Sequence, residues 1–194
     1  MSRKFVLTIV LILFLLPFVS WYYLNSGLEW RKQAQEIMSG TQPFPSGEFI
    51  SIDDRKLTSD SLDQRVSLVS FLPCGEDVKG QMGVIDVIYN QFKETNKATY
   101  ILLDSCLTPP ATYPELTRKN WYILPCPDSL VMFQSLKKDW PEGKTFALVD
   151  RKGIIRSYYA INTKDEKRIL VEHMSLLLPR ERQEKVELKR GDKK

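Results

Sequence analysis

The feature that most constrains the fold of this chain is an apolar run that ends in Pro-Cys-Gly. Residues 67–72 are rich in apolar and β-branched side chains, as is typical of a buried strand, and Pro73 and Gly75 then predict a tight turn. Apolar residues recur at helical spacing over residues 78–92. Cys74 is therefore predicted to lie between the carboxyl end of a strand and a helix N-terminus, where the helix dipole favours a thiolate.

The N-terminal segment carries no charged residue from Phe5 to Leu28. About 20 helical residues, at ~1.5 Å each, cross a hydrocarbon core of about 30 Å, so this run is long enough to span a membrane. The alternative is a cleaved signal peptide, but the run is long, bulky aromatic residues occupy its exit and an Ala-x-Ala-like cleavage site is hard to find. We therefore interpret residues 1–28 as a signal anchor that forms a single transmembrane helix.

The charges that flank this anchor predict its orientation. Arg3 and Lys4 precede the apolar run, and the positive-inside rule places this end of the chain in the cytoplasm. The membrane is then a partner of the N-terminal helix, and the rest of the chain is extracytoplasmic, or periplasmic in a Gram-negative bacterium. Thiols can be oxidised in such a compartment.

Beyond the anchor, the composition predicts one folded domain between two polar segments. Residues 29–47 predict a short polar helix followed by a linker that contains proline and glycine. Residues 48–179 are long enough to build one core. Residues 180–194 hold seven basic and four acidic side chains, and we expect a solvated, disordered tail there. The sequence has no basic stripe with interleaved aromatic residues, so we expect no nucleic-acid partner.

Within the domain, strand and helix patterns alternate. The predicted elements are a hairpin over residues 49–59, strands over 67–72, 98–104 and 121–124, helices over 79–95, 128–138 and 163–178, a short helix after Pro114, and a second hairpin from strands over 146–149 and 154–159. A strand, a helix and a second strand over residues 67–104 form a unit whose right-handed crossover makes its two strands parallel. The order predicts an α/β sandwich with an N-terminal β-hairpin.

Two further cysteines follow predicted strands. Cys106 and Cys126 each come two residues after a strand, as Cys74 does. The carboxyl ends of parallel strands meet at one edge of a sheet, where α/β folds place their sites. Neighbouring strands lie about 4.8 Å apart, within the range of a disulfide. All three cysteines are therefore candidate site residues, with Cys106–Cys126 or Cys74–Cys106 as pairs, and the alternative is a structural disulfide or three inert thiols.

Two other titratable residues have plainer interpretations. His173 is the single histidine and lies on an apolar helical stripe, which favours a core residue over a ligand. Asp104 comes at a strand end, where it suits either the orientation of a site or the capping of a loop.

The order of elements and several local phrases resemble one known family, the thioredoxin-fold proteins of the Sco/SenC type. The matching phrases are residues 49–58, Asp60-Ser61-Leu62, residues 67–71 with Cys74, Ile101-Leu102-Leu103-Asp104 with Thr108-Pro109, Trp121, and Ala147-Leu148-Val149-Asp150 with Gly153. The resemblance covers residues 49–178 and includes the single anchor. It implies a thioredoxin-like fold and a role in respiratory oxidase biogenesis.

The resemblance also implies a copper site, which this sequence fills only in part. In that family a Cys-x-x-x-Cys pair and a later histidine bind copper, and the cysteines can cycle as a dithiol. Cys74 matches the first cysteine, but Val78 stands at the second position, and Glu142-Gly143-Lys144 contains no histidine. Because copper(I) favours thiolate and imidazole donors, we expect no metal and no other cofactor, and we disfavour a copper chaperone.

Two functions from different classes remain. The first is a non-catalytic binding or assembly module that docks a protein partner. The second is a thiol–disulfide oxidoreductase that uses Cys74 with Cys106 or Cys126. The sequence does not decide whether the chain is an enzyme, but the lack of a resolving cysteine close to Cys74 favours the binding module.

Overall fold

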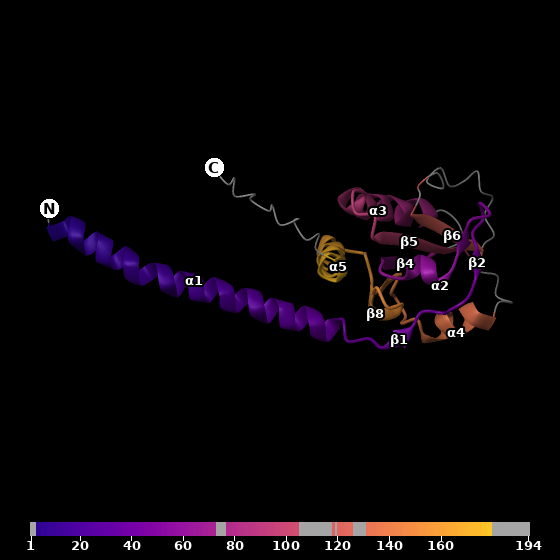
Figure 1. The fold of residues 1–194 in the computed structure, drawn as a ribbon, viewed down its shortest axis with the longest axis horizontal. Coiled ribbons are helices and arrows are strands. Elements are labelled where there is room, and N and C mark those ends of the chain that lie inside the picture. Colours follow the sequence, from indigo (N-terminus) through magenta and orange to yellow (C-terminus); the bar gives the residue numbers. More distant parts are fainter. Residues whose placement is uncertain (1–2, 73–76, 105–117, 119, 126–130, 180–194) are drawn as a thin grey trace, which may run out of the picture.

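A computed structural model describes residues 3–72, 77–104, 118, 120–125 and 131–179 (Figure 1). The elements are α1 (Arg3–Ile37), β1 (Gln42–Pro43), β2 (Phe49–Ile50), β3 (Lys56–Leu57), α2 (Ser59–Leu62), β4 (Val66–Leu72), α3 (Asp77–Phe92), β5 (Ala98–Asp104), β6 (Trp121–Pro125), α4 (Val131–Asp139), β7 (Phe146–Val149), β8 (Ile154–Tyr159) and α5 (Lys164–Leu177). The short helix predicted after Pro114 and the tail predicted over residues 180–194 lie outside the described residues.

Six strands form one mixed sheet in the order β1-β8-β7-β4-β5-β6, and β2 pairs with β3 in a separate hairpin. β4 is parallel to β5, which is parallel to β6, whereas β7 runs antiparallel to both β4 and β8. The parallel pairing of the first two long strands, predicted from the strand–helix–strand order, is confirmed. The α/β sandwich is confirmed as well.

The buried side chains of the sheet alternate between two apolar layers. One layer joins strand residues to α3 and α5, through Ile85, Ile88, Leu170 and Met174 among others. The other joins the opposite face to the hairpin, α2 and α4, and includes Leu136. Because β4 and β5 are covered on both faces, nearly all of their residues are buried.

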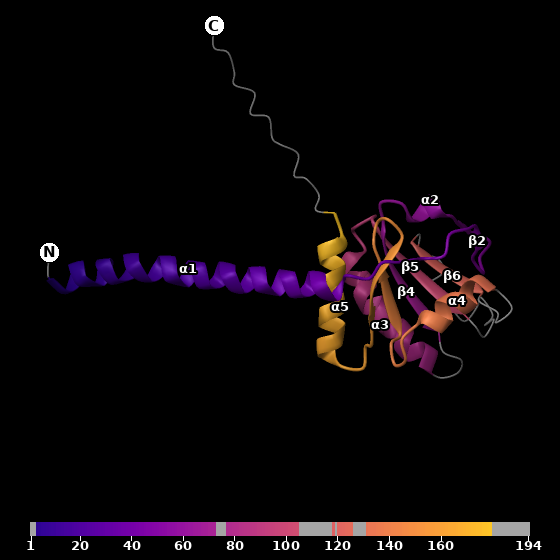
Figure 2. The same cartoon turned by 90° about the horizontal axis from the view of Figure 1, so that it is seen from below.

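α1 is one continuous helix of 35 residues. At ~1.5 Å per residue it is about 52 Å long. Between Leu11 and Leu28 the large apolar side chains of the helix are exposed. Ala34 is 2% exposed and Met38, directly after the helix, is 7% exposed, and both belong to the layer that holds α3 and α5. Figures 1 and 2 show the helix projecting from the domain. One side of the last helical turn therefore packs against the domain core.

The segment that we predicted as a linker packs against the sheet. Gln42 and Pro43 pair with β8 as an edge strand, and Phe44 is buried. The Gly40 amide donates to the Arg156 carbonyl at 3.0 Å. These contacts are made with residues more than a hundred positions later, so local composition alone could not reveal them.

The hairpin of β2 and β3 covers the open edge of β6. The Ser51 hydroxyl donates to the Ile123 carbonyl at 2.9 Å and accepts from the Ile123 amide at 3.1 Å. The Arg55 guanidinium donates to the Trp121 carbonyl and lies over the Tyr122 ring. These contacts satisfy backbone groups of an edge strand that would otherwise be free to pair with another chain.

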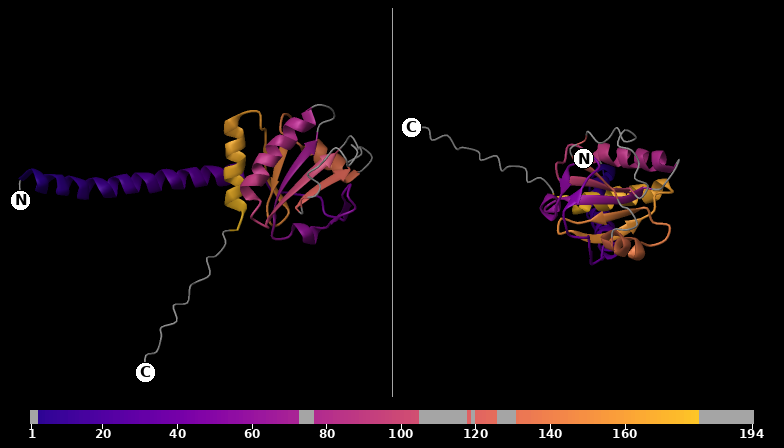
Figure 3. Two further views of the ribbon diagram at one scale, coloured as in Figure 1. Left: turned by 90° about the horizontal axis from the view of Figure 1, so that it is seen from above. Right: turned by 90° about the vertical axis from the view of Figure 1, so that its right-hand side faces the viewer.

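α5 closes the domain beside the end of α1. It begins with a capping box, in which the Thr163 hydroxyl accepts from the Glu166 amide and the Glu166 carboxylate accepts from the Thr163 amide. Figures 2 and 3 show α5 lying across the end of α1, while the parallel strands run away from α1. The carboxyl edge of the sheet therefore lies on the side of the domain away from the N-terminal helix.

Candidate functional site

The three parallel strands end in register at one edge of the sheet. Leu72, the last residue of β4, is the register partner of Asp104, the last residue of β5. Asp104 is in turn the register partner of Pro125, the last residue of β6. The chain segments that follow these strands therefore leave the sheet at the same level, as the sequence predicts for the site.

The predicted cysteines belong to those following segments. Cys74 and Cys106 come two residues after β4 and β5, and Cys126 comes directly after β6. All three lie outside the described residues. Their pairing and their reactivity therefore stay predictions, and what the structure adds is the register of the strands that precede them.

The described residues at this edge are closely packed. Asp104 is 1% exposed, and Ser70 on the neighbouring strand is fully buried. The Ser70 hydroxyl donates to the Thr145 carbonyl at 3.1 Å, and this bond ties β4 to the segment before β7. The strand ends that precede the cysteine-containing segments are therefore buried and joined by hydrogen bonds.

The segment in which the resemblance would place a histidine lies at the same edge. Ser70 near the end of β4 is the register partner of Phe146, the first residue of β7, so residues 141–144 reach the sheet beside the end of β4. The Trp140 indole donates to the Lys144 carbonyl at 2.8 Å, and Gly143 has a φ of +74°. This tight turn offers neither an imidazole nor a thiolate.

The turn at residues 141–144 therefore supplies neither a histidine nor a cysteine to the copper(I) site that the resemblance implies. Among the described residues, no three His, Asp, Glu or Cys side chains form a group that could hold a metal ion. The one histidine of the chain, His173, lies on α5. This helix crosses the end of α1, on the side of the domain opposite the carboxyl edge of the sheet (Figure 2).

His173 is a core residue, as its position on an apolar stripe predicts. It is 3% exposed, and its Nδ1 lies 2.8 Å from the Tyr159 hydroxyl. Burial lowers the pKa of His173 below its ordinary value, although the nearby Glu172 acts in the opposite direction. The imidazole is therefore neutral at pH 7 and packs against β8.

An aromatic cluster beside the candidate edge was missed in the sequence. Trp140 contacts Phe71 with ring centroids 4.7 Å apart, and it contacts Tyr158 with centroids 4.9 Å apart. Phe71 is the penultimate residue of β4, three positions before Cys74. Burial, helped by the charge of Asp139, raises the pKa of Tyr158. Tyr158 and Tyr159 are adjacent in a strand, so only one of the two rings can lie on this face of the sheet, and the packing assigns Tyr158 to it.

Solved structures that resemble the chain are thioredoxin-fold proteins. A SCO1/SenC family lipoprotein from Bacillus anthracis str. Ames is 18% identical, with a TM-score of 0.57 over 72% of this chain and 96% of that chain. A Bacteroides thetaiotaomicron protein described as a disulfide isomerase is 19% identical, with a TM-score of 0.56 over 73% and 94%. BsSco, from the Sco family of cytochrome c oxidase assembly proteins, is 20% identical, with a TM-score of 0.51 over 71% and 95%.

No protein-family model matches the sequence, and no curated protein matches it significantly. The likeness to solved structures nevertheless covers more than two thirds of the chain and nearly all of each neighbour. It confirms, at the level of the fold, the resemblance to Sco/SenC-type proteins that the sequence predicts. The chain is thus a thioredoxin-like mixed α/β protein with an N-terminal apolar helix that could anchor it in a membrane.

Proposed function

We propose that this chain is a membrane-tethered, extracytoplasmic thioredoxin-like protein that binds a partner protein as a non-catalytic assembly module of the Sco/SenC type. The observation that carries the proposal is the junction between α1 and the domain. α1 is apolar and long enough to cross a membrane, and Ala34 near its end is packed in the domain core. A domain held at the membrane surface in this way is suited to binding a partner protein at a fixed position.

The likeness to BsSco suggests the process in which such a module would act. BsSco belongs to a family of cytochrome c oxidase assembly proteins. We propose a role in the assembly of a respiratory oxidase, with the carboxyl edge of the sheet directed away from the membrane and toward the partner. A copper-chaperone role is disfavoured, because the turn at residues 141–144 provides no imidazole and Val78 replaces the second cysteine.

A second candidate function is thiol–disulfide exchange, favoured by the register of Leu72, Asp104 and Pro125. In this reaction the Cys74 thiolate attacks one sulfur of a partner disulfide, and the other partner sulfur leaves as a thiolate. Cys106 or Cys126 then attacks Cys74, which releases the partner as a dithiol and leaves a disulfide in this chain. Two electrons pass to the partner, and an external dithiol must reset the protein.

A cysteine substitution in cells that lack the chain separates the two functions. For a binding module, Cys74→Ser restores full growth and oxidase activity at wild-type protein levels in the membrane. For thiol exchange, the same variant is inactive, and Cys106→Ser or Cys126→Ser traps a mixed disulfide with the partner. Mass mapping of the non-reduced protein adds a direct check, because three alkylatable thiols would exclude a resting disulfide.

A copper titration tests the metal assignment separately. We expect the full chain to lose copper(I) to a competing chelator of moderate affinity. Tight stoichiometric binding would contradict the argument from the donor set.

A further inference from the structure

A groove between α3 and α5 lies on the face of the sheet opposite α4. Its volume is about 570 Å³, and α3 lines one wall and α5 the other. The α3 wall extends from Gly80 to Gln91, which at ~1.5 Å per residue is about 16 Å. At about 5.4 Å per turn, the length of this wall matches about three turns of a helix, or a short extended segment.

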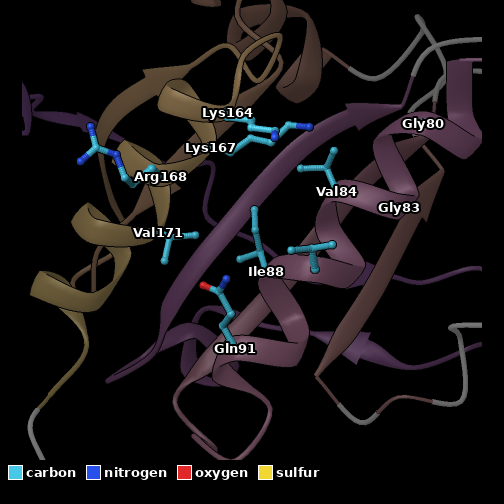
Figure 4. Close-up of a pocket in the computed structure, with 10 residues that line it drawn as sticks. Gly80, Gly83, Val84, Ile88, Gln91, Lys164, Lys167, Arg168 and Val171 are labelled. Atoms are coloured by element: carbon cyan, nitrogen blue, oxygen red, sulfur yellow. The ribbon is translucent and has the colours of Figure 1, made fainter.

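The two walls differ in chemistry. Val84, Val87 and Ile88 give the α3 wall an apolar surface, whereas Lys164, Lys167 and Arg168 line the α5 wall (Figure 4). Figure 4 shows both lysines reaching from α5 toward α3. No acidic residue lines this groove, and within the described part of the chain neither lysine has an ion pair, so the wall presents uncompensated positive charge.

The α3 wall also exposes apolar surface that the domain does not use. Outside α1, the large apolar side chains that the described residues expose are Ile50, Val87 and Ile169, and Val87 is 59% exposed. Gly80 and Gly83 lie inside a helix, where glycine is less favourable than alanine, yet a Cβ at either position would meet no atom within 4 Å. Packing within the domain therefore does not explain these glycines, which leave bare backbone for a partner to approach.

From these features we propose that the groove between α3 and α5 binds an acidic, amphipathic segment of a partner protein. Apolar side chains of the segment contact Val84, Val87 and Ile88, and its carboxylates face Lys164 and Lys167, which is the helix-in-groove mode of recognition. This proposal rests on the proposed function, for which it names the chemistry of the partner. Gly80 is near the start of α3, so a bound segment extends toward the carboxyl edge of the sheet.

The distribution of charge on α5 favours a protein segment, rather than a lipid surface, as the ligand of the groove. Arg168 borders the groove, but Figure 4 shows its guanidinium pointing away from α3, and it lies 3.6 Å from the Asp165 carboxylate and 3.7 Å from the Glu172 carboxylate. The outer face of α5 therefore mixes both signs, and an anionic membrane would meet acidic side chains there. The positive charge without nearby acids lies inside the groove, where an acidic segment reaches it.

A binding assay with a model peptide tests the proposal on the full chain in nanodiscs of zwitterionic lipid. The probe is a fluorescent helical peptide of about 14 residues, with leucines at i, i+3, i+4 and i+7 and glutamates on its flanks. We expect saturable binding, weakened about fivefold by K164Q/K167Q and weakened further at high salt. Val87→Asp should weaken it about tenfold, because it removes an apolar contact and repels the glutamates.

Matched variants on the other face serve as controls. K138Q/K144Q removes two exposed lysines near α4, and Ile50→Asp changes an apolar side chain that is 55% exposed on β2. Both should bind the peptide as the wild type does. Absence of saturable binding, equal binding of a lysine-flanked peptide, or displacement of the peptide by vesicles with about 30% anionic lipid would each overturn the proposal.

Complementation in cells separates this proposal from the proposed function. Val87→Asp, with a wild-type melting temperature, should fail to complement cells in which Ile50→Asp succeeds. If Val87→Asp complements fully, the groove proposal is wrong, whereas the partner-binding function stands.

Discussion

The Tyr159 hydroxyl lies 2.8 Å from Nδ1 of His173, and this bond joins β8 to α5 inside the core. Tyr159 is 5% exposed, and burial raises its pKa, so the hydroxyl keeps its proton. In the tautomer of the neutral imidazole that carries its proton on Nε2, this hydroxyl donates to Nδ1. A buried pair of this kind makes the packing of α5 sensitive to protonation of His173.

We expect the free energy of unfolding to fall as the pH is lowered below about 6.5, the ordinary pKa of histidine. Burial lowers the pKa of His173 in the fold, so the unfolded chain takes up the proton first and gains stability. The loss continues down to the folded pKa, with a slope of at most ~1.4 kcal/mol per pH unit. Denaturation of wild type and His173→Gln between pH 8 and pH 5 checks this, and equal slopes would contradict it.

Asp150→Asn should destabilise the β7–β8 turn by about 2 kcal/mol at neutral pH. The Asp150 carboxylate accepts from the Lys152 and Ile154 amides and forms an ion pair with Arg156 at 2.6 Å. Chemical denaturation measures the loss. Asp165→Asn is the matched control, because the Asp165 side chain is 84% exposed, and it should change stability by less than about 0.5 kcal/mol.

The cost of Asp150→Asn should also depend on pH. Burial alone would raise the pKa of Asp150, but hydrogen bonds from the Ile154 amide and from Arg156 outweigh burial and hold it below its ordinary value. A lowered carboxyl pKa stabilises the fold above the ordinary value, near 4, and this stabilisation is lost as the pH falls through the folded pKa. The difference between wild type and variant should therefore shrink below about pH 4, and a constant difference would argue against the ion pair.

Gly40→Ala should cost about 1–3 kcal/mol, because a Cβ at Gly40 would lie 2.5 Å from the Ile155 carbonyl oxygen and 2.6 Å from that of Arg156. Both are backbone atoms of β8 and cannot move without opening the edge of the sheet. Gly83→Ala is the control, since a Cβ there meets no atom within 4 Å, and it should stabilise α3 by about 0.5–1 kcal/mol. If both variants melt at the same temperature, the close approach of this segment to β8 is refuted.

Ser51→Ala should cost about 1–3 kcal/mol, because it leaves the Ile123 amide at the edge of β6 without its acceptor. Ser51 is 2% exposed, so water cannot easily take the place of its hydroxyl. Ser175→Ala, at an exposed position of α5, removes a hydroxyl that donates to the Glu172 carbonyl and should have little effect. Hydrogen exchange supplies the readout, with faster exchange of the Ile123 amide expected in Ser51→Ala alone.

The sequence predicted the central elements because their signals are local. The apolar run of β4, the helical spacing that follows it and the run of β5 each lie within one window of the chain, and their parallel order follows from crossover handedness. The edge strand at Gln42 and Pro43 was predicted as a linker instead, because its partners on β8 lie more than a hundred residues later. Proline is compatible with an edge strand as well as with a linker.

The candidate site was predictable in part for the same reason. The positions of the cysteines relative to strand ends follow from the sequence, and the structure confirms that those strands end in register. The contact of Phe71 with Trp140 depends on where the segment before β7 returns to the sheet, which no local pattern specifies. The groove between α3 and α5 likewise exists only once two helices distant in sequence lie side by side.

The continuous path of α1 into the core has a geometric consequence. Because Ala34 is buried with the residues of α3 and α5, no joint separates the helix from the domain. Where α1 spans a bilayer, any turn of the helix about its own axis turns the carboxyl edge of the sheet through the same angle. A contact that another transmembrane helix makes with α1 inside the bilayer would thus set the rotational orientation of the domain outside it.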